Sequence, residues 1–366
     1  MKILVINPGS TSTKLAVFDD DTILSSAAVS HGEEILAYKG IFDQYDYRLG
    51  LVQSFLKEAG IGLTELDAVC GRGGLVRPIP CGTYTVTQDM IHDLRAEVCG
   101  RHASNLGPAL ALGIAEAAGI SAFIVDPITV DELQPTARLT GMPQIMRESR
   151  CHTLNMKAVA RKAAQAMGRR YEDVNFIVVH LGTGTSIAAH EHGRMIDMCD
   201  ARGEGPMSCD RFGGVNTYLA LTDALSHADS ADEAFMRSMY TRGGLYAHLG
   251  TKDVREIERR IAAGDAYAEL VLDTMIYQCA KEIGAQAAAL RGAVDRIIVT
   301  GGIAFDERLM QLLEEQVRWI APVLLMPGEE EMQALALGAL RVLRGEEPAR
   351  DYKREADALE ASIVNG

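Results

Sequence analysis

The feature that most constrains this chain is a turn rich in glycine and hydroxyl residues between two apolar β-type runs, ILVINPGSTSTKLAVF at residues 3–18. The apolar runs predict the two strands of a hairpin. Backbone N–H groups and side-chain hydroxyls in such a turn donate hydrogen bonds to anions. We therefore predict a phosphate-binding turn, with Asn7 and Lys14 at the strand ends and with Gly9, Ser10, Ser12 and Thr13 in the turn.

A Walker A loop is the main alternative for a turn of this composition. That loop needs a second glycine before its lysine and opens a helix immediately after it. Here no second glycine precedes Lys14, and the Leu-Ala-Val-Phe run that follows predicts a strand. The hairpin is therefore the better interpretation.

Two further glycine-rich turns follow apolar strands later in the chain. Residues 177–188, IVVHLGTGTSIA, repeat the strand, turn and strand pattern, with His180 ending the first strand and a turn of Gly182, Thr183 and Gly184. In the third, a β-branched strand from Arg296 runs into Gly301 and Gly302, and a helical pattern begins near Asp306. Glycines at such positions let the backbone approach a charged or flat ligand closely.

Length and composition restrict the class of protein. A chain of 366 residues with 48% hydrophobic residues predicts about two domains, each with its own core. The net charge of −14, without any basic run, argues against nucleic acid as a partner. The seven cysteines contain no C-x-x-C pair and indicate a reducing, cytoplasmic location. Residues 106–125 are apolar but are interrupted by glycine, proline and glutamate, so we expect no membrane partner.

The apolar periodicity predicts a layered α/β protein. Strands and helices alternate from about residue 106 onward, and this alternation is typical of α/β layers. The pattern predicts helices at about 106–118, 155–167, 266–290, 306–317 and 331–343, and strands at about 122–125, 176–180, 296–299 and 323–326. We place the change of domain near residue 150.

Five ordered motifs over nearly the full length resemble the acetate kinase (acetokinase) family, and most closely its butyrate-phosphorylating members. They are INPGSTSTK from Ile6, GRGGLVRP from Gly71, HLGTGTSI from His180, CDRFGG from Cys209 and VTGGIA from Val299. This family is part of the acetate and sugar kinase, actin and heat-shock chaperone superfamily. The resemblance implies two ribonuclease-H-like (actin-like ATPase) domains with an interdomain ATP cleft: residues 1–150 plus about 331–366 on the acid side, and 151–330 on the nucleotide side.

The resemblance also implies the reaction, in which ATP phosphorylates the carboxylate of butyrate by direct in-line transfer. A carboxylate is already ionised at neutral pH, so no general base is needed. The site must provide cations, hydrogen-bond donors and Mg²⁺ around the transferring phosphoryl group. By resemblance the catalytic residues are Arg211 of CDRFGG, His180, His152, Asn7 and Asp126.

The remaining roles are also implied by resemblance. Phosphates of ATP would contact the two hairpin turns, from Gly9 to Lys14 and from Gly182 to Gly184, together with Gly301 and Gly302. Asp126 and Glu329 would serve Mg²⁺, and Glu330 and Glu331 remain alternatives to Glu329. Arg72 and Arg77, which flank a glycine pair, are the candidates for the carboxylate of the acid.

Two alternatives stay open at this stage. Within the same class, the acid could be acetate, propionate or a branched-chain acid. From a different class, an actin-like or chaperone-like ATPase would use nucleotide on a protein partner and would bind no small acid. We also expect a homo-oligomer, a dimer or higher.

Overall fold

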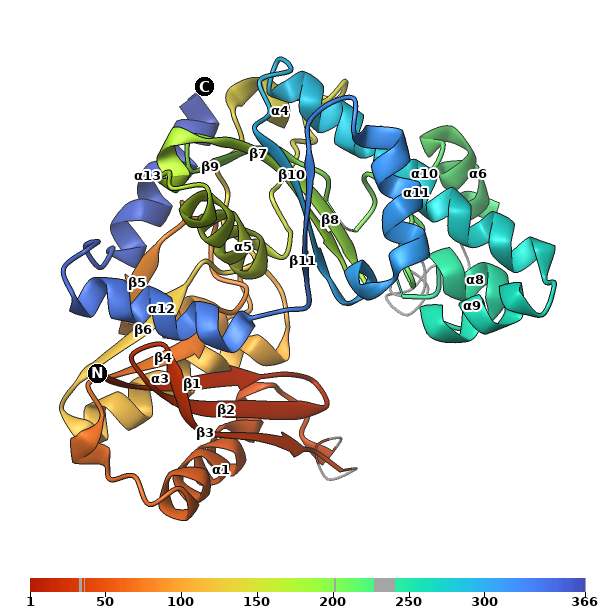
Figure 1. Cartoon of the computed structure of the whole chain (residues 1–366). Helices are drawn as coiled ribbons and strands as arrows, with labels where there is room; N and C mark the ends of the chain where they lie inside the picture. The colour runs from red at the N-terminus through yellow and green to blue at the C-terminus, as the bar shows by residue number, and fades with distance from the viewer. Residues whose placement is uncertain (33–34, 36, 201, 227–240, 366) are drawn as a thin grey trace. The chain divides into compact units, whose positions relative to one another are not determined.

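The structure is a computed structural model that describes residues 1–32, 35, 37–200, 202–226 and 241–365. The chain divides into two compact units (Figure 1). Unit 1 contains Met1–Glu132, Thr153–Asn155 and Glu330–Gly366, and unit 2 contains Leu133–His152 and Met156–Glu329. No helix among the described residues has the length and apolar character needed to cross a membrane.

Unit 1 is built on a six-stranded sheet with the order β3-β2-β1-β4-β6-β5. The strands β1, β2 and β3 form an antiparallel meander, β4 and β6 continue the sheet parallel to β1, and β5 is antiparallel to β6. The bounds are β1 Lys2–Pro8, β2 Ser12–Asp19, β3 Thr22–Ser30, β4 Ala68–Arg72, β5 Thr83–Thr85 and β6 Ser121–Val125.

Helices cover both faces of this sheet. One face forms a core with α1 and α3, in which Ile6 and Val69 of the sheet lie with Val52 and Leu110 of the helices. On the other face α12 packs so closely that a Cβ at Gly338 would lie 2.4 Å from the Val125 side chain. The helices are α1 Tyr45–Glu58, α2 Gln88–Arg95, α3 Leu106–Ala118, α12 Glu331–Leu343 and α13 Tyr352–Asn365, with short 3-10 turns at Phe42–Gln44, Leu63–Glu65 and Ala103–Asn105.

Unit 2 repeats this plan with a five-stranded sheet of order β11-β10-β7-β8-β9. Again three strands form an antiparallel meander, and two more strands run parallel to the first of them. The bounds are β7 Asn175–Leu181, β8 Thr185–Glu191, β9 Arg194–Met198, β10 Arg296–Gly301 and β11 Val323–Pro327. The turn after β1 therefore corresponds to the turn after β7, and Gly73-Gly74 after β4 corresponds to the glycine pair that ends β10.

Helices α10 and α11 pack on one face of the unit 2 sheet. Residues Val179 and Leu181 face a core with α10 and α11. Because side chains alternate along a strand, His180 faces the opposite side. The helices are α4 Pro135–Arg138, α5 Thr153–Ala166, α6 Thr217–Ser226, α8 Gly244–Leu249, α9 Val254–Ala262, α10 Ala266–Ala289 and α11 Glu307–Val317, with 3-10 turns at Tyr171–Asp173 and Gly302–Phe305.

The predicted elements and the α/β class are confirmed. The residues after Lys14 form β2, which excludes the helix that a Walker A loop would open. The helix expected near Asp306 begins at Glu307, where the Asp306 side chain accepts a hydrogen bond from the backbone N–H of Leu309 as the N-cap.

Candidate functional site

The first predicted turn lies between β1 and β2, with Asn7 paired to Lys14 across the hairpin. Ser10 and Thr11 are exposed at its tip, whereas Thr13 is fully buried. The turn is closed by the backbone N–H of Gly9, which donates to the carbonyl oxygen of Ser12 at 2.7 Å. The exposed tip therefore presents hydroxyls and backbone to a ligand, while Thr13 connects the turn to the interior.

Side chains at the ends of β1 and β4 meet at the first turn of α12. The Nδ2 atom of Asn7 donates to Glu331 Oε2 at 3.1 Å, and Arg72 forms an ion pair with Glu331 Oε1. The strand that ends at Arg72, β4, also passes very close to α3: a Cβ at Gly71 would lie 2.3 Å from the carbonyl oxygen of Gly107. The structure thus brings Asn7 and Arg72 together, as a candidate acid site should.

Arg77 lies in a different environment within unit 1. Its guanidinium forms ion pairs with Asp357 and Glu360 of α13, and its backbone N–H donates to the hydroxyl of Tyr352 at 3.2 Å. These contacts connect Arg77 to the C-terminal helix α13. We therefore retain Arg72 as the candidate for the carboxylate.

Asp126 follows β6 in a conformation that is unusual for a residue with a side chain. Its φ angle is +38°, in the left-handed region, and its carboxyl group is buried. The backbone N–H of Gly82 donates to Asp126 Oδ1 at 2.7 Å, and the backbone N–H of Asp126 donates to the Gly82 carbonyl oxygen at 3.1 Å. Backbone strain of this kind is found at ligand sites, so the conformation is compatible with the role predicted for Asp126.

In unit 2 the two predicted histidines lie against each other. The rings of His152 and His180 stack with their centroids 4.0 Å apart and their planes 16° apart. His152 is the N-cap of α5, and its Nδ1 atom lies 3.0 Å from the hydroxyl oxygen of Ser186 on β8. Because Ser186 pairs with His180 across the β7/β8 hairpin, the hairpin register sets the position of both rings.

The three consecutive glutamates of the chain have different neighbours. Glu329 belongs to unit 2, where its Oε1 atom lies 3.3 Å from His180 Nε2. Glu331 belongs to unit 1, where it holds Asn7 and Arg72. Glu330 is the N-cap residue of α12. Within the described chain no three His, Cys, Asp or Glu side chains gather into a metal-binding group.

The loop that carries Arg211 lies beside the second phosphate turn. The backbone N–H of Cys209 donates to the carbonyl oxygen of Thr183 at 3.2 Å. Arg211 Nε donates to Asp210 Oδ1 at 3.2 Å, and Lys252 Nζ donates to Asp210 Oδ2 at 2.8 Å. One largely buried carboxylate is thus shared by two cations next to the turn.

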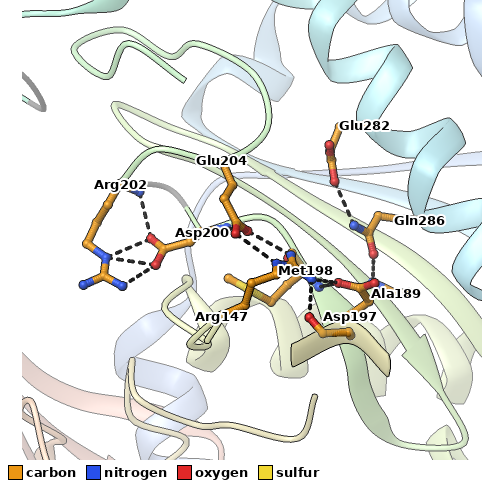
Figure 2. Close-up of polar contacts among 10 residues, drawn as sticks. Arg147, Ala189, Asp197, Met198, Asp200, Arg202, Glu204, Glu282 and Gln286 are labelled. Carbon is orange, nitrogen blue, oxygen red and sulfur yellow. Dashed lines mark hydrogen bonds and ion pairs between the residues drawn. The ribbon is translucent and has the colours of Figure 1, made fainter. Parts of the chain in front are cut away.

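A polar network shown in Figure 2 fixes the stem of the same loop. Arg147 donates from Nε and Nη2 to the two carboxylate oxygens of Glu204, at 2.9 and 2.8 Å, and from Nη1 to Asp197 Oδ1 at 2.9 Å. These carboxylates raise the pKa of Arg147. The backbone N–H of Asp200 donates to Glu204 Oε2 at 3.0 Å. Arg147 therefore connects β9 to the segment that leads to Arg211.

A cavity of about 830 Å³ opens beside the second turn and lies wholly within unit 2. The predicted residues Gly182, Thr183, Gly302 and Glu329 line it. A Cβ at Gly302 would meet nothing within 4 Å, so this glycine borders open space, whereas a Cβ at Gly301 would lie 2.3 Å from the Leu181 carbonyl oxygen. The remaining lining residues were not predicted: Cys209, Lys252, Asp253, Val254, Arg255, Ile303, Phe305 and Asp306.

Part of this missed lining has a sequence signal, but an ambiguous one. Asp253 is the N-cap of α9 and accepts a hydrogen bond from the backbone N–H of Arg255 at 3.0 Å. The run Lys-Asp-Val-Arg therefore predicts a helix start, and nothing in it indicates a ligand. Phe305 is exposed at the cavity, where an aromatic ring offers a flat apolar surface.

Comparison with solved structures identifies the fold as that of the actin-like ATPases, with two domains. Acetate kinase from Porphyromonas gingivalis matches with a TM-score of 0.77 at 20% identity, over 93% of this chain and 99% of that one. A propionate kinase from Francisella tularensis subsp. tularensis SCHU S4 matches with a TM-score of 0.73 at 17% identity, over 92% and 98%. The ROK hexokinase from Thermus thermophilus matches at 0.51 and 19%, over 94% and 100%. At these identities the likeness shows the fold.

The family comparison is more specific. Residues 142–319 match the model of the Acetokinase family. This segment includes His152, His180, Arg211 and the Gly301-Gly302 turn, so the sequence pattern of that family covers most of the unit 2 site.

Proposed function

We propose that this protein transfers the γ-phosphoryl group of ATP to the carboxylate of a short-chain acid, most specifically butyrate, to give an acyl phosphate and ADP. The match to the Acetokinase family supports a carboxylate kinase. The observation that carries the proposal is the unit 2 cavity, where the second phosphate turn, Glu329 and Lys252 line one space.

ATP is proposed to bind in this cavity. Its phosphates would face Gly182, Thr183 and Gly302, where backbone N–H groups can donate to them. The exposed ring of Phe305 would provide the apolar surface for the base. The cations Arg211 and Lys252, held by Asp210, would offset the negative charge that shifts between oxygens during transfer.

Mg²⁺ is the expected cofactor, and it would supply further charge neutralisation of the phosphates. Asp126 and Glu329 are the residues that would hold it. Mg²⁺ keeps most of its water ligands and needs only one or two protein carboxylates. Glu329 lines the cavity, and its carboxylate is therefore accessible to a hydrated ion.

The acid is proposed to bind in unit 1, where Arg72 and Asn7 meet at Glu331. An incoming carboxylate would compete with Glu331 for the Arg72 guanidinium, which binds carboxylates in a two-point geometry. The expected localisation is cytoplasmic, and a homo-oligomer remains part of the proposal.

The choice of acid is the finest part of the proposal, and a substrate series tests it. Butyrate has two methylenes more than acetate, each contributing about 0.8 kcal/mol when buried, so a fitted pocket favours it by roughly 1.6 kcal/mol, or about 15-fold. We expect kcat/KM to rise from acetate through propionate to butyrate with saturating MgATP, measured by hydroxylamine trapping of the acyl phosphate.

Two results would change the proposal in different ways. Acetate used as well as butyrate would replace butyrate by a shorter acid and leave the carboxylate kinase in place. ATP hydrolysis without any dependence on added acid would instead favour an actin-like or chaperone-like ATPase.

A further inference from the structure

A buried arginine lies directly behind the turn that joins β1 and β2. Arg48, on α1, has no exposed surface. Its Nη2 atom donates to the carbonyl oxygen of Gly9 at 3.0 Å, and its Nη1 atom donates to Thr13 Oγ1 at 2.7 Å. The guanidinium therefore contacts both ends of the turn from its inner side.

No carboxylate balances this charge among the described residues. The other contacts of Arg48 go to Gln44 Oε1, which accepts from Nε at 3.0 Å and from Nη2 at 2.9 Å. Gln44 is a neutral amide. Burial lowers the pKa of Arg48, but a guanidinium remains protonated in proteins. Among the described residues, the positive charge of Arg48 therefore has no carboxylate partner.

An uncompensated buried charge destabilises a fold unless an opposite charge approaches it. The open approach is from the outer side of the turn, where Ser10 and Thr11 are exposed. An anion bound there would be separated from Arg48 only by the turn itself. The hydrogen bonds from Arg48 also polarise the turn, because the Gly9 carbonyl oxygen and the Thr13 hydroxyl oxygen accept from a positively charged group.

We propose that Arg48 is a positioning residue for a phosphoryl group that binds on the outer side of the Gly9–Thr13 turn, and that it provides the positive charge of that site from behind. Thr13 then acts as a link, because its hydroxyl already contacts Arg48 and lies 3.0 Å from His31 Nε2. This role of Arg48 extends the proposed function. It depends on that function only for which molecule carries the phosphoryl group, ATP or the acyl phosphate.

A sequence signal for this role exists on α1. The buried face of this helix contains Arg48 together with Val52, Phe55 and Leu56. Arginine is rarely fully buried, and an arginine on an otherwise apolar stripe indicates a specific interior partner. Here the partner is the turn, and Gln44 fixes the guanidinium one helical turn earlier.

The test neutralises Arg48 without removing its contacts. Gln44→Glu replaces the accepting amide oxygen with a carboxylate oxygen of similar size, so both hydrogen bonds to Arg48 remain while its charge is paired. Gln53→Glu is the matched control, because it makes the same change at an exposed position of α1, the helix for which Gln44 is the N-cap residue. The readouts are the Kd of inorganic phosphate by titration calorimetry and the rise of Tm with added phosphate.

We expect Gln44→Glu to bind phosphate at least about tenfold more weakly than Gln53→Glu, the scale of losing one charge-assisted contact. Its Tm rise with phosphate should be lost. Equal phosphate affinity in the two variants would overturn the proposal. If Gln44→Glu does not fold, Thr13→Val breaks the contact between Arg48 and the turn at nearly constant shape, and unchanged phosphate binding in that variant overturns it instead.

Binding measurements with ATP, ADP and the acyl phosphate distinguish which molecule carries the phosphoryl group. A loss of affinity for ATP but not for ADP supports binding of the terminal phosphoryl group of the nucleotide, and a loss for the acyl phosphate supports binding of the product. Phosphate binding requires no turnover. A wild-type protein without acid kinase activity would therefore refute the proposed function and still leave the role of Arg48 testable.

Discussion

At the scale of single residues, the charged side chains of unit 2 are arranged around one shared carboxylate. Asp210 accepts from both Arg211 and Lys252, and Cys209 joins their loop to the phosphate turn through Thr183. The proposed chemistry needs a rigid cation at a defined point. A guanidinium held by a neighbouring carboxylate satisfies that need better than a mobile surface charge would.

Replacing Arg211 with lysine tests this arrangement. Lysine retains the charge but lacks the planar fork that makes paired hydrogen bonds, so Arg211→Lys should lower kcat by ~10²-fold or more, the order seen when one preorganised donor is lost. The control is Arg170→Lys, at a solvent-exposed side chain paired with Asp173 and absent from the cavity lining. Steady-state rates with MgATP and butyrate decide the matter, and a near-normal kcat in Arg211→Lys would remove Arg211 from the mechanism.

At the scale of the elements, the two glycines at the end of β10 have different surroundings and are expected to have different roles. Gly301 has a φ angle of +93° and lies against the β7 backbone, whereas Gly302 borders the cavity. Gly301→Ala should therefore destabilise the fold by about 2 kcal/mol or more through backbone strain and overlap. Gly302→Ala should leave Tm almost unchanged and weaken ATP binding, because its methyl group enters the open space. Thermal unfolding and ATP titration of both variants would contradict this division if Gly302→Ala bound ATP normally.

A second element-scale prediction concerns the contact between α10 and β8. Glu282 accepts from Gln286 Nε2 at 2.8 Å, and Gln286 Oε1 accepts from the backbone N–H of Ala189 at 3.1 Å (Figure 2). Burial raises the pKa of Glu282, and Asp197 and Glu204 raise it further. The hydrogen bond from Gln286 and the charge of Arg147 lower it, but the net shift is upward. A raised pKa means that the folded state favours the protonated form.

The stability contributed by Glu282 is therefore complete below the pKa of an unfolded glutamate and is lost as the pH rises through the raised value. Glu282→Gln should stabilise the protein by about 1 kcal/mol at pH 7, the usual size of a single-substitution effect, and by much less near pH 4. Urea unfolding at the two pH values measures this difference. Glu314→Gln, at an exposed position on α11, provides the control, and equal effects of Glu282→Gln at both pH values would contradict the assignment.

At the scale of the whole molecule, the candidate residues are divided between two units. Asn7, Arg72 and Asp126 belong to unit 1, and His180 and Arg211 belong to unit 2. In-line transfer requires the acid and the phosphoryl group to be held a few ångströms apart. The proposed function therefore requires the two units to bring their ligands together.

Domain closure on binding both ligands is the corresponding prediction. ATP analogue together with butyrate should reduce the radius of gyration, since the site would be completed by hinge motion. Small-angle scattering of the free protein, with each ligand alone and with both, measures this. Identical dimensions in all four states would exclude a large closure.

The periodicity of the sequence was sufficient to predict the longer apolar elements, α3, α5, α10, α11 and α12 with β6, β7, β10 and β11, because apolar spacing and capping residues act over a few neighbours. It did not predict the helices α4, α6, α8 and α9 or the strand β9. The glycine turns were also evident from the sequence, whereas the two histidines were proposed from the family resemblance. The first segment of unit 1 ends at Glu132, before the domain change expected near residue 150. The following segment packs on unit 2, where the backbone N–H of Gln134 donates to the Ile196 carbonyl oxygen and Arg147 pairs with Asp197.

Local sequence by itself determined the strands, the helices and the turns that can hold phosphate, since backbone preference and hydrophobic alternation are properties of short segments. Only the tertiary structure decided which partners the charged residues have. In the tertiary structure Glu329 contacts His180, whereas Glu331 forms an ion pair with Arg72. Arg77 pairs with Asp357 of α13, and Lys252 pairs with Asp210. Arg48 donates a hydrogen bond to Thr13 from the inner side of the first turn. These contacts join residues far apart in the chain, and their energy depends on distance and burial, which one-dimensional spacing does not contain.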